Sequence, residues 1–84
     1  MEKITVDDFI ENVTSLTAHG IEINKEEIKK SWDIVKAECE CAHPDVRVLY
    51  SMARRIEDRQ RSINEAEARI CALVSVKKVM EVEK

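Results

Sequence analysis

The chain has 84 residues, of which 44% are apolar and 37% charged, with a net charge of −3, one glycine and one proline. This length allows a single domain, residues 1–84, and the scarcity of glycine and proline favours long helices over a turn-rich β fold. The negative charge disfavours a dedicated nucleic-acid binder, and the short apolar runs predict no membrane-spanning helix.

The first predicted helix covers residues 5–19. Thr5 is a favoured N-cap, and Asp8 three residues later completes a capping-box pattern. Gly20 is expected to end this helix, because glycine readily adopts the left-handed conformation after a last turn. The apolar residues recur at helical spacing and predict one buried stripe, made of Val6, Phe9, Ile10, Val13 and Leu16.

The second predicted helix covers residues 24–42. Asn24 is placed as its N-cap and Glu27 as the capping-box partner. His43 precedes Pro44 and should be extended, so the helix is expected to end near Ala42. Its predicted buried stripe consists of Ile28, Trp32, Val35, Cys39 and Ala42.

The third predicted helix is long and covers residues 44–82, with Pro44 in its first turn. A seven-residue repeat runs along it through Leu49, Met52, Ile56, Arg59, Ile63, Ala66, Ile70, Leu73, Lys77 and Met80. Two alternatives stay open in the middle. Charges of opposite sign four residues apart favour one continuous helix, whereas Ser62 followed by Glu65 could cap a new helix after a break near residues 59–62.

The predicted fold is therefore all-α, with two short capped helices and one long C-terminal helix in a helical hairpin or bundle. Neither short helix is long enough to cover the third, so apolar surface is left for a second copy of the chain. We expect a homodimer or larger homo-oligomer, with these residues at the contact: Ile34, Cys41, Ile63, Ile70 and Leu73.

Metal-binding and catalytic chemistry are not expected. Cys39, Cys41 and His43, with the distant Cys71, are the nearest approach to a ligand set. Two cysteines separated by one residue point about 200° apart on a helix, and the chain has no second pair. A single glycine excludes a glycine-rich phosphate loop. We therefore expect no metal, no cofactor, no catalytic residue and no enzyme, and the odd number of cysteines, without an apolar leader, favours a reducing, cytoplasmic location.

Charge is unevenly distributed along the chain. All six arginines lie between Arg47 and Arg69 and all eight lysines lie outside that segment, so residues 1–42 carry −5 and residues 43–84 carry +2. Guanidinium groups bind carboxylates and phosphates with planar, paired hydrogen bonds. The predicted partner- or anion-binding residues are Arg47, Tyr50, Arg54, Arg55, Arg59 and Arg61. The interleaved acids leave a self-paired, solvated surface as the alternative.

These features predict a small interaction protein, an adaptor or inhibitor of the kind that phages and plasmids encode. Its expected partner is another protein, bound through helix faces and the arginine-rich surface. The alternative is a binder of a nucleotide or other phosphate ligand in an arginine-lined groove between subunits. A helix-turn-helix DNA binder ranks third, because its recognition helix would begin Lys25-Glu26-Glu27 and bring carboxylates to the phosphates.

Overall fold

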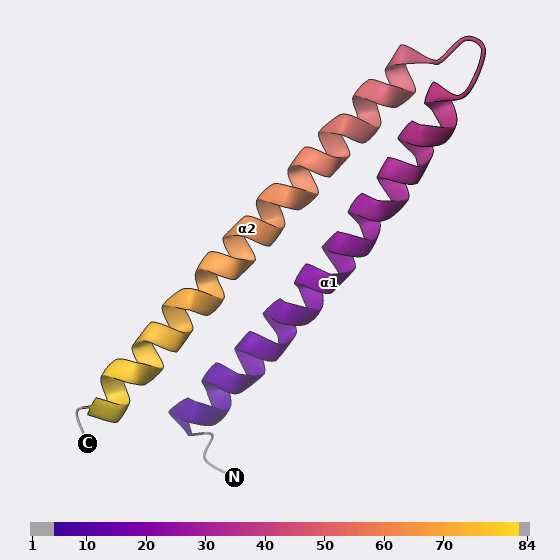
Figure 1. Cartoon of the computed structure of the whole chain (residues 1–84). Coiled ribbons are helices and arrows are strands. Elements are labelled where there is room, and N and C mark those ends of the chain that lie inside the picture. Colours follow the sequence, from indigo (N-terminus) through magenta and orange to yellow (C-terminus); the bar gives the residue numbers. More distant parts are fainter. Residues whose placement is uncertain (1–4, 83–84) are drawn as a thin grey trace.

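The computed structural model in Figure 1 describes residues 5–82. Within them the chain forms two helices, α1 (Val6–Cys39) and α2 (Val46–Val82), joined by a short turn. The helices run antiparallel, side by side, in a rod of 65 × 26 × 14 Å (Figure 1). The expected all-helical fold is confirmed as a helical hairpin. We call the end where α1 begins and α2 finishes the open end, and the opposite end the turn end.

The first two predicted helices are a single helix, so the expectation of a break after residue 19 was wrong. Gly20 lies inside α1 with a negative φ, and Asn24 is an internal residue of the helix and not its cap. Glycine costs a helix interior about 1 kcal/mol relative to alanine. Ile21, directly after it, is only 7% exposed, and burying it on α2 outweighs that cost.

The ends of the helices follow ordinary capping chemistry. The Thr5 hydroxyl accepts a hydrogen bond from the Asp8 amide at 3.1 Å, which confirms the predicted N-cap. At the turn, the Asp45 carboxylate accepts a hydrogen bond from the Arg47 amide at 2.9 Å and caps α2. The Glu38 carboxylate accepts a hydrogen bond from the Asp45 amide at 2.7 Å and so connects the end of α1 to the start of α2. Helix α2 therefore begins two residues later than the proline led us to expect.

Helix α2 is continuous through residues 59–62, as the first of the two alternatives required. Ser62 donates a hydrogen bond to the Asp58 carbonyl at 3.2 Å, one turn back, and does not cap a new helix. The predicted seven-residue repeat faces α1. All its members up to Lys77 are partly or fully buried, whereas Met80 is exposed. The repeat in α2 was therefore a reliable guide to packing.

Helix α1 packs on α2 through a more polar seam than the sequence suggested. Its least exposed residues alternate at spacings of three and four: Ile10, Thr14, Thr17, Ile21, Asn24, Ile28, Ser31, Val35 and Glu38. Ser31, only 2% exposed, is satisfied by donating to the Glu27 carbonyl at 2.9 Å. The predicted stripes were wrong in part, because several of their members are exposed, namely Val6, Phe9, Leu16, Trp32, Cys39 and Ala42.

Candidate functional site

Two polar contacts join the helices near the middle of the hairpin. The Arg59 guanidinium donates a hydrogen bond to the Asn24 side-chain oxygen at 3.0 Å, and Arg55 pairs with Glu27 at 2.7 Å. Asn24 and Arg59 both occupy the seam, where an apolar pair would be ordinary. A pair of this kind favours one alignment of the two helices, because sliding α1 along α2 would leave both groups partly buried without partners.

The same contacts define the two flanks of the hairpin. In a seven-residue repeat abcdefg with Ile21 and Ile63 at position a, Glu27 and Arg55 are both at position g. Trp32 and Ala53 are both at position e and line a common groove. In an antiparallel pair of helices, positions g thus meet on one side of the seam and positions e on the other. We call these sides the g flank and the e flank.

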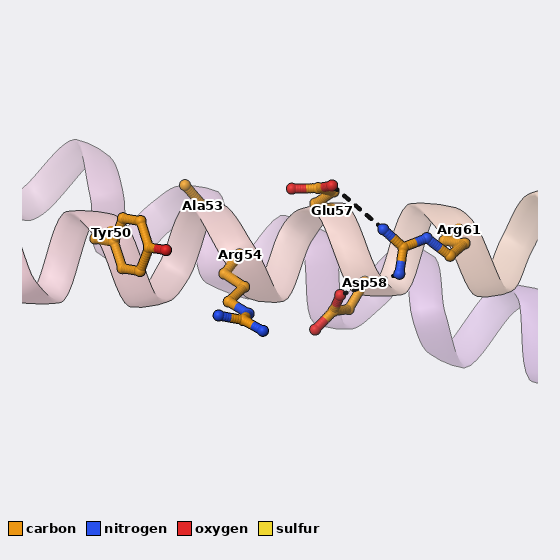
Figure 2. Close-up of a pocket in the computed structure, with 6 residues that line it drawn as sticks. All are labelled: Tyr50, Ala53, Arg54, Glu57, Asp58 and Arg61. Carbon is orange, nitrogen blue, oxygen red and sulfur yellow. Dashed lines mark hydrogen bonds and ion pairs between the residues drawn. The ribbon is translucent and has the colours of Figure 1, made fainter.

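The predicted arginine cluster divides between two faces. Arg55 and Arg59 reach toward α1, whereas Arg47, Arg54 and Arg61 recur at a spacing of seven along the outer face of α2. Arg61 pairs with Glu57 at 3.3 Å and with Asp58 at 3.8 Å, and Arg47 pairs with Asp45 at 3.5 Å. Among residues 5–82, Arg54 makes no ion pair, and Figure 2 shows the dashed contact from Glu57 ending on Arg61 and not on Arg54.

Two hollows meet near the turn end. A shallow hollow of about 300 Å³ lies on α2 and is lined by Tyr50, Ala53, Arg54, Glu57, Asp58 and Arg61 (Figure 2). An apolar groove of about 370 Å³ lies between the helices and is lined by Trp32, Val35, Cys39, Leu49, Ala53 and Ile56. Ala53 lines both, so the two hollows adjoin at this residue. We call Trp32, Tyr50, Ala53 and Arg54 together the turn-end surface.

The sequence analysis missed two members of this surface, Ala53 and Trp32, of which Trp32 is the large one. It was placed in a buried stripe, and the structure leaves it 50% exposed. That stripe was derived for a separate helix that begins at Asn24. The signal that could have found it is the repeat of Ile21, Ile28 and Val35 at a spacing of seven, which puts Trp32 at position e, beside the seam and not in it.

A third hollow, of about 510 Å³, brings three of the predicted arginines together. It lies on the g-flank side of α2 and is lined by Ser51, Arg54, Arg55, Asp58, Arg59 and Ser62. Two of its guanidinium groups are already engaged, Arg55 with Glu27 and Arg59 with Asn24. A bound anion would therefore have to share or displace these partners.

The predicted oligomer-contact residues fall into two groups. Ile63 is 3% exposed, and Ile70 and Leu73 are half-buried, all at seam positions facing α1 of the same chain. Helix α1, which was expected to be two short helices, is long enough to cover these three residues. Ile34 and Cys41 are exposed at g positions near the turn, so this second predicted group does present free surface.

Within residues 5–82, no three side chains of His, Cys, Asp or Glu gather closely enough to hold a metal ion. Cys39, Cys41 and Cys71 are all exposed free thiols. Neither helix, over its described residues, has a stretch with the length and hydropathy of a membrane span. No protein-family model, curated protein or solved structure matches this chain.

Proposed function

We propose that this chain is a non-enzymatic interaction protein, an adaptor or inhibitor, that binds another protein through its turn-end surface. The observation that carries the proposal is that the two hollows adjoin at Ala53, so that the exposed side chains of Trp32, Tyr50 and Arg54 line neighbouring hollows of one surface. Tryptophan, tyrosine and arginine are the residue types that dominate the binding energy of protein interfaces.

The exposure of these side chains supports an intermolecular role. Tyr50 is 67% exposed and Trp32 is 50% exposed, so neither is committed to the core. The groove beside Trp32 is apolar and open to an aliphatic or aromatic side chain of a partner. Arg54, which makes no ion pair among the described residues, lines the adjoining hollow on α2 and is available to bind a carboxylate. This combination is typical of an apolar contact centre with a charged rim.

The proposal is tested by affinity purification from the native host with tagged wild-type and variant chains. Trp32→Ala and Arg54→Glu should each reduce recovery of the same co-purifying protein by about tenfold or more. Val74→Ala and Lys78→Glu are the matched controls, because they make similar changes at exposed positions near the open end. All four variants should keep a helical circular dichroism spectrum. Undiminished recovery with a Trp32→Ala/Arg54→Glu double variant would refute the turn-end surface.

A second candidate function is binding of a phosphate-bearing ligand in the hollow lined by Arg54, Arg55 and Arg59. The observation that favours it is that three arginines and two serines line one hollow, which Asp58 also lines. It ranks second because Arg55 and Arg59 already have partners on α1. Calorimetric titration with inorganic phosphate and with a nucleotide should give saturable binding that weakens steeply with salt and is lost in Arg54→Gln. No heat of binding at low salt would eliminate this candidate.

A further inference from the structure

Apolar side chains gather on the g flank at the open end. From the Glu27–Arg55 pair, three heptads toward the open end lead to Val6 on α1 and Val76 on α2, again both at position g. The neighbouring g and c positions of α1 are also apolar, as are the c positions Ala72 and Val79 of α2, whereas the next g position of α2 toward the middle is Arg69. We define the open-end patch as Val6, Phe9, Val13, Leu16, Val76 and Val79. Phe9 is 57% exposed and Leu16 73% exposed, so the hairpin itself does not cover them.

The opposite flank of the same end is acidic. Its e positions hold Glu11 on α1 and Glu67 and Glu81 on α2, with Val74 between the last two. The open-end patch itself contains no charged residue. Two charged residues, Glu65 and Arg69, lie at its inner border, in a groove of about 400 Å³ that Leu16 also lines. The two flanks therefore differ in whether a second apolar surface could pack on them without burying charge.

The patch is large relative to the core of a single chain. Among the described residues only Ile10, Ile21 and Ile63 are buried apolar side chains. The exposed area of the patch is on the order of 500 Å² per chain, so pairing two patches would bury about 1,000 Å², the lower range of specific protein interfaces. Chains of this size commonly gain the burial they lack by associating.

We propose that the open-end patch is the contact between two copies of this chain, which pack about a two-fold axis as four helices. A second copy fits because an uncharged apolar patch is complementary to itself under two-fold symmetry. The acidic e flank is not, since the same symmetry would bring like charges together. The contact uses the g and c positions of both helices and leaves the turn-end surface accessible. It does not depend on the proposed function.

The first test is sedimentation velocity over a range of concentrations. The wild-type chain should dimerise, and Leu16→Glu should raise the dissociation constant by at least about tenfold because it buries a charge in the contact. Ser15→Glu is the matched control: it adds the same charge one residue away, on the e-flank side, and should change the constant less than about twofold. Because Leu16 is exposed in the hairpin, circular dichroism should show both variants folded.

The second test locates the contact directly. In a chain with Cys39, Cys41 and Cys71 replaced by serine, Phe9→Cys should be cross-linked between copies by a flexible bis-maleimide, and Glu11→Cys should not. Cross-linking at Phe9 alone, together with a weaker Leu16→Glu dimer, supports the proposal. A wild-type chain that stays monomeric at every concentration would overturn it. So would a dimer that tolerates Leu16→Glu and is not cross-linked at Phe9, because two copies would then meet elsewhere.

Discussion

The middle of the hairpin and its open end place different chemistry at equivalent positions of the repeat. In the middle, the facing g positions hold Glu27 and Arg55, which pair within the chain at 2.7 Å. Three heptads away, the facing g positions hold Val6 and Val76, and both side chains are about half exposed. The first pair is satisfied by the hairpin alone, whereas the second leaves apolar surface in water.

This difference indicates that the contacts in the middle of the rod and those at its open end have different roles. Polar contacts such as Asn24–Arg59 depend on the relative alignment of α1 and α2, so they set the register of the hairpin. Apolar contacts are non-directional and accept any complementary apolar surface. The middle is therefore suited to holding the two helices in one alignment, and the open end to association.

The largest expected effect comes from placing a charge in the seam. Ile63 is 3% exposed, so Ile63→Asp should lower the free energy of unfolding by about 3 kcal/mol or more, by losing apolar burial and burying a carboxylate. Chemical denaturation at fixed protein concentration measures it. Ala68→Asp, on the exposed outer face of the same helix, is the control and should cost less than about 1 kcal/mol. Equal losses for the two variants would show that α1 does not cover Ile63.

A smaller effect is expected at the polar contact in the middle. Arg59→Ala leaves the partly buried Asn24 side chain without its donor and should cost about 1–2 kcal/mol. Arg54→Ala, on the outer face, should stay within about 0.5 kcal/mol of wild type. Thermal melts of both variants and of Asn24→Ala/Arg59→Ala measure the coupling. Additive single-variant losses would mean that the two side chains do not interact.

The smallest expected effect is a gain in stability at Gly20, which lies between the middle of the hairpin and its open end. Gly20 has a negative φ, and a Cβ built there meets no atom within 4 Å. Gly20→Ala should therefore stabilise the chain by about 0.5–1 kcal/mol through helix propensity. If Gly20 instead ended a helix in the left-handed conformation, the same substitution would destabilise the chain. The sign of the shift in melting temperature thus distinguishes one long helix from two short ones.

Helix α2 could be predicted in detail because its sequence is internally consistent. Leu49, Ile56, Ile63 and Ile70 repeat at a spacing of seven, without a later glycine or proline to interrupt them. Even the two charged members of the repeat, Arg59 and Lys77, are partly buried, and Arg59 meets Asn24 in the seam. The sequence near residues 59–62 could not show whether the helix breaks there. A serine with a glutamate three residues later, as in Ser62 and Glu65, is compatible with both a helix cap and a helix interior.

Helix α1 was harder to predict from the sequence, because its local capping signals disagree with the way the helix packs. Gly20 and Asn24 resemble an end and a beginning, and the apolar residues on either side form two separate stripes. The candidate site suffered from the same error. With α1 divided in two, Trp32 was expected to be buried. Of the five arginines in the predicted cluster, two reach toward α1 and three lie along the outer face of α2.

By itself, the sequence determined that this chain is helical, that Thr5 begins a helix, and which face of α2 is buried, because capping, propensity and a regular repeat are local properties. Only the tertiary structure decided that α1 runs unbroken through Gly20, and that Thr17, Asn24 and Ser31 face α2 while Phe9, Leu16 and Trp32 do not. The physical reason is that a glycine or a polar seam residue is neutral or unfavourable in isolation. Each is tolerated when a second helix buries the neighbouring apolar residue, as at Gly20 and Ile21, or supplies a hydrogen-bonding partner, as Arg59 does for Asn24.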